Sequence, residues 1–163
     1  MNIRSVRLTD AEQIAEIYNF YILNTHHSFE IEPLSADEMQ QRISAFSENY
    51  PYLVAEESGE ILAFAFASCF KPRSAYQHSA EVSVYVKNDL KQKGIGTKLY
   101  EKLFAELAKM NVHAIIAGIS LPNDASVKLH EKFGMEKVAH FREVGFKLGR
   151  WIDVGYWELI NKK

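Results

Sequence analysis

The chain has 163 residues, 47% of them hydrophobic and 25% charged, which predicts one compact domain over residues 1–163 with a core of its own. Its formal net charge of -2 argues against a general affinity for nucleic acid or an anionic membrane. The single cysteine, Cys69, excludes an intrachain disulfide and is expected to be a small core residue. The chain shows no signal-peptide layout and no apolar stretch near the roughly 20 residues of a membrane helix, so a cytoplasmic location is expected.

The first third of the chain predicts one strand followed by two helices. Ile3–Arg7 alternates apolar and charged residues, which is typical of a short strand. Two capping boxes, each a Ser or Thr three residues before a Glu, then predict two helix starts. These boxes are Thr9 with Glu12 and Ser35 with Glu38. The second box precedes a helix expected near Asp37–Phe46.

The rest of the chain alternates strands and helices. Two strands, Tyr52–Glu56 and Ile61–Phe70, are joined by a tight turn at Ser58-Gly59. The later elements are a strand at Ala80–Lys87, a helix ending near Met110, a strand at Val112–Ile119, a helix at Asn123–Phe133 and strands at Glu136–Phe146 and Trp151–Leu159. This order predicts a mixed α/β sheet with helices on both faces.

A glycine loop between the Ala80–Lys87 strand and the next helix is the strongest single signal in the chain. The loop residues are Gln92, Lys93, Gly94, Ile95, Gly96 and Thr97. A helix N-terminus carries partial positive charge and unpaired N–H groups, so a loop of this kind suits a diphosphate. Gly94 and Gly96 let the phosphate approach the backbone closely. The other interpretation is an ordinary turn before a helix.

Two nucleotide-binding motifs are excluded by spacing. A P-loop needs Gly-Lys-Ser/Thr, which the loop lacks, and a dinucleotide fingerprint needs a third glycine where the chain has Leu99. The pattern Lys91-x-x-Gly94-x-Gly96 instead resembles the acyl-CoA loop of the GNAT superfamily of N-acetyltransferases. That family usually has Gln or Arg at the first position.

The resemblance becomes narrower when longer runs are compared. Runs spread between Ile3 and Leu159 resemble phosphinothricin acetyltransferases. They are Lys71–Tyr76, Ala80–Val86, Leu121–Asp124, Leu129–Glu131, Gly145–Lys147 and Trp151–Trp157. The resemblance implies the GNAT fold with about four helices on a seven-stranded sheet, acetyl-CoA as donor and a homodimer.

In this superfamily two neighbouring parallel strands splay apart to admit the pantetheine arm, and the matching strands here are Ala80–Lys87 and Val112–Ile119. Backbone groups of Val84, Tyr85 and Val86 are then expected to pair with the arm and to polarise the thioester carbonyl. Asn123 is expected to bind near the pantetheine, and the glycine loop to hold the pyrophosphate.

Two residues are the expected catalytic groups. The subfamily's glutamate falls on Glu81, which would take a proton from the acceptor's ammonium directly or through one water. His130 takes the place where many members carry a tyrosine that protonates the leaving thiolate, and an imidazole can donate or accept a proton near neutrality. Without the resemblance, Glu81 would be interpreted as a solvent-facing strand residue and His130 as a packed helix residue.

Four residues are expected to bind the acceptor, namely Phe29, Lys71, Arg73 and Tyr76. An arginine can grip a carboxylate with two parallel hydrogen bonds, so a pocket of this composition suits a zwitterion such as phosphinothricin, methionine sulfone or methionine sulfoximine. For Lys71 an ordinary exposed loop is an equal alternative. The remaining histidines show no metal-ligand spacing, so no metal site is expected.

Two other functions remain open from the sequence. One alternative keeps the same chemistry with another amino acid, a polyamine or a protein N-terminus as acceptor, although Lys71 and Arg73 argue against a polyamine. A non-catalytic acyl-CoA-binding module is the alternative from a different class, and the presence of both Glu81 and His130 argues against it.

Overall fold

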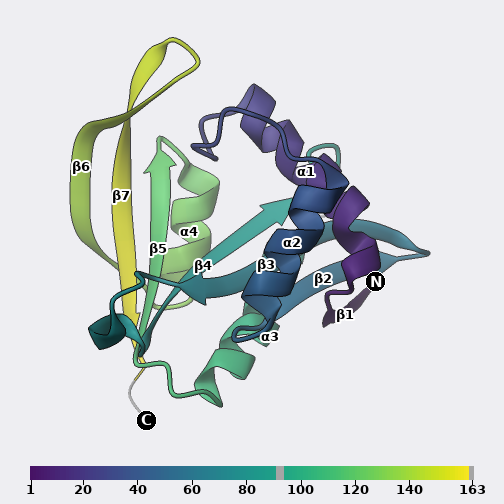
Figure 1. Cartoon of the computed structure of the whole chain (residues 1–163). Helices are drawn as coiled ribbons and strands as arrows, with labels where there is room; N and C mark the ends of the chain where they lie inside the picture. Colours follow the sequence, from purple (N-terminus) through teal and green to yellow (C-terminus); the bar gives the residue numbers. More distant parts are fainter. Residues whose placement is uncertain (91–93, 162–163) are drawn as a thin grey trace. The chain divides into compact units, whose positions relative to one another are not determined.

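The computed structural model describes residues 1–90 and 94–161, and within them the elements follow the predicted order (Figure 1). The helices are α1 (Ala11–Asn24), α2 (Ala36–Ser47), α3 (Ile95–Ala108) and α4 (Asp124–Lys132). The strands are β1 (Asn2–Ser5), β2 (Tyr52–Glu57), β3 (Glu60–Cys69), β4 (Ser79–Val86), β5 (Ala114–Leu121), β6 (Glu136–Lys147) and β7 (Arg150–Ile160). Short 3-10 helices at Leu8–Asp10 and Ser74–Tyr76 complete the described elements.

The seven strands form one mixed sheet, as the sequence predicted. They are hydrogen-bonded in the order β1-β2-β3-β4-β5-β7-β6. Strand β4 runs parallel to β5, and the pairs β1–β2, β2–β3, β5–β7 and β7–β6 are antiparallel. The parallel register joins Ser79–Glu81 with Ala114–Ile116 and covers only these three positions.

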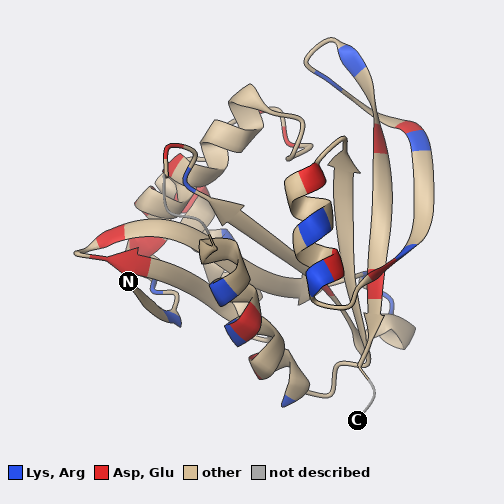
Figure 2. Ribbon diagram, turned by 180° about the vertical axis from the view of Figure 1, so that it is seen from behind, with Lys and Arg blue, Asp and Glu red and all other residues tan. Residues whose placement is uncertain are grey.

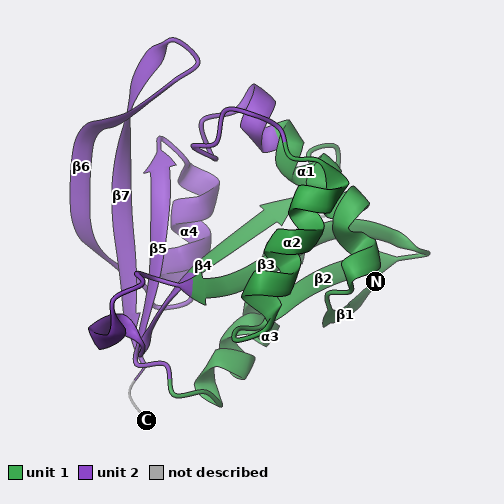
Figure 3. Ribbon diagram, in the orientation of Figure 1, with its two compact units in different colours: residues 1–20, 34–68, 82–111 green, residues 21–33, 69–81, 112–163 purple. Residues whose placement is uncertain are grey.

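The chain divides into two compact units (Figure 3). Unit 1 comprises residues 1–20, 34–68 and 82–111. Its core includes the apolar face of α3, where Ile95, Leu99, Leu103 and Leu107 recur every fourth residue and are buried. Strands β2 and β3 are buried along most of their length, so this face of α3 has apolar surface to pack against.

Unit 2 comprises residues 21–33, 69–81 and 112–163. It contains the first three residues of β4, which pair with β5, and the long β6–β7 hairpin, whose strand β7 pairs with the other edge of β5. A two-residue turn closes this hairpin, with Leu148 at φ 52° and Gly149 at φ 75°, and this backbone matches the twist of the flanking strands. The predicted Ser58-Gly59 turn in unit 1 has the same conformation, with φ 53° and 84°.

Two local expectations were wrong. The first helical segment begins at Leu8 rather than after a Thr9 cap, because the Asp10 carboxylate accepts the main-chain N–H of Arg7 at 2.7 Å and fixes the first turn there. Cys69 is exposed rather than in the core. It is the last residue of β3, where its thiol donates to the carbonyl oxygen of Lys71 at 2.9 Å. The second capping box, Ser35 with Glu38, is confirmed.

Charges of both signs are interspersed along α3 and α4 (Figure 2). Within residues 1–90 and 94–161, no helix combines the length and the apolarity that crossing a membrane requires. Over the same residues, His, Cys, Asp and Glu side chains form no group of three or more suited to a metal ion.

Candidate active site

Glu81 lies on β4 within unit 2, where its carboxylate accepts a hydrogen bond from the main-chain N–H of Gly118 on β5. The side chain is partly buried. Burial raises the pKa of the Glu81 carboxyl above its ordinary value of 4.5, and the Gly118 hydrogen bond opposes that rise. The solvent-facing interpretation of Glu81 is therefore wrong, and the site holds a carboxyl whose pKa is moved toward neutrality, as a general base requires.

Gly118 and Tyr156 complete the surroundings of Glu81. Gly118 is paired with Tyr156 across the β5–β7 ladder. A Cβ on Gly118 would lie 3.2 Å from Cε1 of Tyr156 and 3.5 Å from Oε1 of Glu81. The tyrosine ring and the carboxylate thus approach the same point above Gly118, and only the absence of a side chain there leaves room for both.

His130 is the buried residue of α4, with 3% of its surface exposed. Its Nδ1 lies 2.7 Å from the carbonyl oxygen of Ser126, one turn earlier. Because a carbonyl oxygen only accepts, Nδ1 carries the hydrogen. Burial lowers the pKa of the His130 imidazole, and the Ser126 bond partly offsets this. The neutral imidazole with its hydrogen on Nδ1 is therefore the form favoured near pH 7.

Asn123 has a structural role beside the predicted one. Its side-chain oxygen accepts the main-chain N–H of Ser126 at 3.2 Å and caps α4. The carboxamide nitrogen is the donor that remains for a ligand. The capping bond therefore fixes the orientation of the Asn123 side chain, which was predicted to bind the pantetheine.

The helix expected after the glycine loop begins at Ile95, so Ile95, Gly96 and Thr97 form its first turn instead of loop. Gly94 is the N-cap at φ 87°, and a Cβ there would meet no atom of residues 1–90 or 94–161 within 4 Å. A glycine cap supplies no side chain to the first N–H groups of the helix, which leaves them for an anion. These residues fit the pyrophosphate of coenzyme A. Gln92 and Lys93, also predicted for this role, lie outside the described residues, as does Lys91.

Val84, Tyr85 and Val86 form the end of β4 in unit 1, and all three are partly buried. The Tyr85 ring lies edge-on to Tyr18, with centroids 4.9 Å apart, and stacks on Phe64 at 5.4 Å. These aromatic contacts fix one face of the strand. The backbone that was predicted to pair with pantetheine is thus held by side chains of α1 and β3.

The structure brings two of the predicted acceptor-binding residues together in the segment between β3 and β4. The Lys71 amino group lies 5.7 Å from the ring centroid of Tyr76 and 5.3 Å from that of Phe70. Arg73 precedes the short 3-10 helix that carries Tyr76, and it is exposed. The segment thus offers one cation, Lys71, beside two aromatic rings, and a second, exposed cation, Arg73, two residues further along the chain.

Phe29 lies elsewhere in unit 2, against the hairpin. Its ring packs on Gly145 of β6 so closely that a Cβ there would lie 2.4 Å from Cε2. The segment around Phe29 is tied to the strands, since Lys147 donates to the carbonyl oxygen of Ser28 at 2.5 Å. The structure therefore attaches Phe29 to β6, while Lys71 and Tyr76 contact each other.

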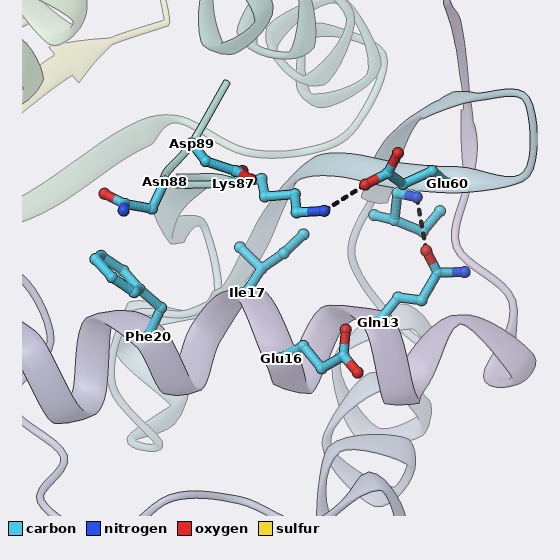
Figure 4. Close-up of a pocket in the computed structure, with 9 residues that line it drawn as sticks. Gln13, Glu16, Ile17, Phe20, Glu60, Lys87, Asn88 and Asp89 are labelled. Carbon is cyan, nitrogen blue, oxygen red and sulfur yellow. Dashed lines mark hydrogen bonds and ion pairs between the residues drawn. The ribbon is translucent and has the colours of Figure 1, made fainter. Parts of the chain in front are cut away.

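A cavity of about 370 Å³ opens in unit 1 between α1 and the ends of β3 and β4. Figure 4 shows Lys87 reaching toward Glu60, with which it forms an ion pair, and Gln13 accepting the main-chain N–H of Ile61 at 2.8 Å. None of its lining residues is a predicted site residue. Lys87, Glu60 and Gln13 are thus already paired within the protein.

Sequence reasoning missed Gly118 and Tyr156. One signal was available, because an isolated glycine inside a predicted strand marks a close approach of another group. The identity of that group depends on the β5–β7 register, which the sequence does not specify.

Comparison with known proteins identifies the class. Residues 3–155 match the family model for the acetyltransferase (GNAT) domain, and the chain belongs to that family. It is 38% identical over 153 residues to a phosphinothricin N-acetyltransferase of Streptomyces coelicolor, covering 91% of this chain and 90% of that protein. It is 32% identical over 165 residues to an L-methionine sulfoximine/L-methionine sulfone acetyltransferase of Salmonella typhimurium, covering 98% and 94%.

A solved structure agrees with the sequence relatives. The GNAT superfamily phosphinothricin acetyltransferase of Sinorhizobium meliloti, in complex with acetyl-CoA, has a TM-score of 0.93 and 34% identity, covering 98% of this chain and 87% of that one. The protein is therefore an acetyl-CoA-dependent N-acetyltransferase. Within its superfamily it is similar to the phosphinothricin acetyltransferases.

Proposed function

We propose that the enzyme acetylates the amino group of a small amino-acid-like acceptor, such as phosphinothricin, methionine sulfone or methionine sulfoximine. The relatives named above act on acceptors of this kind. Lys71 and Arg73 supply positive charge for the acceptor's acidic group, and Tyr76 and Phe29 supply aromatic surface. Its location in the cytoplasm stays a prediction.

The general base is Glu81, and its environment is the observation that carries the proposal. The acceptor enters as an ammonium, which must lose a proton before its nitrogen can attack. Glu81 takes that proton, the nitrogen–carbon bond forms and the carbon–sulfur bond breaks, and the second proton that the nitrogen loses passes to the departing thiolate, so that coenzyme A leaves as its thiol. A partly buried carboxyl with a raised pKa is suited to the first step. His130 is the second proposed acid–base group.

The donor is held by main-chain groups. We assign the pyrophosphate to Gly94, Ile95, Gly96 and Thr97 with the neighbouring Gln92 and Lys93, and the pantetheine to Val84, Tyr85, Val86 and Asn123. The open glycine cap of α3 supports the first assignment. The remaining carboxamide nitrogen of Asn123 supports the second.

A thiol-release assay tests the function directly. Each reaction contains the protein, acetyl-CoA and one amine. The amines are phosphinothricin, methionine sulfone, methionine sulfoximine, spermidine and a peptide with a free N-terminus. Fast release with the amino-acid analogues alone is the expected result. Release with spermidine or with the peptide instead would show that the acceptor is a polyamine or a protein N-terminus. No release with any amine would exclude transferase activity toward this panel.

We also propose that two copies associate through the β6–β7 hairpin. Six large apolar side chains of the hairpin and its turn are more than half exposed, which is typical of an interaction surface. They are Val138, Phe141, Val144, Phe146, Leu148 and Trp151. Light scattering should give a dimer for the wild type and a monomer for a Phe146→Glu/Trp151→Glu variant. A monomeric wild type at micromolar concentration would contradict the proposal.

A further inference from the structure

The space above Gly118 is bounded by two groups whose oxygens can both accept a hydrogen bond from an amine. From β4 comes the Glu81 carboxylate, an acceptor, and from β7 comes the Tyr156 phenol, which can donate and accept. Both come within 3.5 Å of the position that a Gly118 Cβ would occupy. Glu81 acts on the phenol through its charge, and the Glu81 oxygen and the Tyr156 ring carbons Cε1 and Cζ face the same point above Gly118, at 3.5, 3.2 and 3.4 Å from it.

The Tyr156 ring is held firmly on both sides. Phe141 contacts it edge-on, with ring centroids 5.8 Å apart, and the bare backbone of Gly118 lies on the other side. The residue is only partly buried, so a ligand can reach it. Burial, followed by the nearby Glu81 charge, raises the pKa of the Tyr156 phenol, and the phenol stays protonated through the neutral range.

We propose that Tyr156 is a second binding group for the acceptor's ammonium, and that the ammonium occupies the space left by the missing side chain of Gly118. This proposal rests on the proposed role of Glu81. The phenol oxygen accepts one ammonium N–H while Glu81 accepts another. One proton then passes to the carboxylate, the neutral amine keeps its lone pair for attack, and the phenol keeps its own proton. Tyr156 thereby fixes where the nitrogen sits, and Glu81 performs the proton transfer.

This role predicts an effect on binding of the acceptor alone. Loss of the hydroxyl should weaken binding of the amine and leave binding of acetyl-CoA unchanged, since no hydrogen bond to the donor is assigned to Tyr156. One hydrogen bond to a charged group corresponds to a loss of about 10-fold or more in affinity. Gly118→Ala should act in the same direction, because its Cβ would meet the ring at 3.2 Å and displace it.

The test uses the whole enzyme with L-methionine sulfone as probe. Calorimetry gives its dissociation constant in the presence of coenzyme A, and steady-state kinetics give KM for both substrates. Tyr156→Phe keeps the ring between Phe141 and Gly118, and Tyr52→Phe is the control for loss of a buried tyrosine hydroxyl. About a 10-fold weaker Kd and higher KM for the amine, with KM for acetyl-CoA within about 2-fold, is the expected result.

The outcomes separate this proposal from the function it rests on. An unchanged amine Kd in Tyr156→Phe overturns the role of Tyr156, whatever the activity. Equal weakening of both substrates also overturns it, since that indicates a structural effect. A Glu81→Gln variant with normal turnover overturns the base assignment and leaves the Tyr156 measurement standing. If Gly118→Ala and Tyr156→Phe act on one contact, the double variant should lose less than the two effects added.

Discussion

Replacing Glu81 by glutamine separates its chemical role from its structural one. Glutamine has nearly the same shape, and its side-chain oxygen can still accept the Gly118 N–H that Glu81 accepts. What is lost is the negative charge and, with it, the ability to take a proton. General-base catalysis contributes about 100-fold to 10,000-fold, so turnover with saturating acetyl-CoA and methionine sulfone should fall by that range.

The same variant should not lose stability at neutral pH. Because burial raises the folded-state pKa of Glu81 above 4.5, the stability that the group contributes is present below pH 4.5 and is lost as pH rises through the raised value. Glutamine never ionises, so the melting temperature of the variant relative to wild type should rise between pH 4.5 and 8. The wild-type rate should rise over the window in which Glu81 loses its proton.

Thiol release measured from pH 4.5 to 9 and thermal unfolding at both ends of the range provide the assays. Glu101→Gln, which removes one exposed carboxylate of α3, controls for the loss of a charge and should change neither readout. Turnover of Glu81→Gln within a few-fold of wild type would refute the assignment of the base. A variant that melts well below wild type at pH 8 would refute the account of its burial.

Three further substitutions test the surroundings of the site. Gly94→Val places a β-branched residue at φ 87°, a left-handed conformation that costs about 1–2 kcal/mol. Calorimetry should show weaker acetyl-CoA binding. Unchanged affinity would indicate that the pyrophosphate binds elsewhere. Gly145→Ala would put a Cβ 2.4 Å from the Phe29 ring and should raise the acceptor KM without raising that for acetyl-CoA. Lys147→Met removes the buried bond to the Ser28 carbonyl and should cost about 1.5–3 kcal/mol in urea unfolding.

Local signals predicted most of the fold, because they act over a few residues. The Ser35–Glu38 box and the Ser58-Gly59 turn each depend on neighbours in sequence, and both appear in the structure as expected. The Thr9 box failed because a competing carboxylate, Asp10, lies one residue further on. The prediction that Cys69 lies in the core was wrong because an apolar run does not indicate the residue at which its strand ends.

The site was predicted less completely than the fold because its environment is built across strands. Alternation along β4 places Glu81 on one face but says nothing of what covers that face. Its burial depends on Gly118 and Tyr156, which come from later strands and meet Glu81 only through the β4–β5 and β5–β7 registers. The resemblance pointed to Glu81 as the proposed base, and the structure supplies the reason for its raised pKa.

His130 presents the last question, since the sequence allows it to donate or to accept a proton. Its Nδ1–H bond to Ser126 leaves Nε2 without a hydrogen in the neutral form, and burial lowers the imidazole pKa below 6.5. A cationic His130 that protonates the thiolate would make kcat fall as pH rises through that lowered value. A neutral His130 predicts no such fall between pH 6.5 and 8.

His130→Asn tests this directly, because the asparagine amide can still donate to the Ser126 carbonyl but has no counterpart of Nε2. If neutral His130 participates through Nε2, kcat should drop at every pH between 6.5 and 8, and the shape of the profile should not change. An alkaline decline of wild-type kcat in that window that disappears in His130→Asn would show that the cationic form delivers the proton. The burial of this imidazole would then oppose catalysis instead of tuning it.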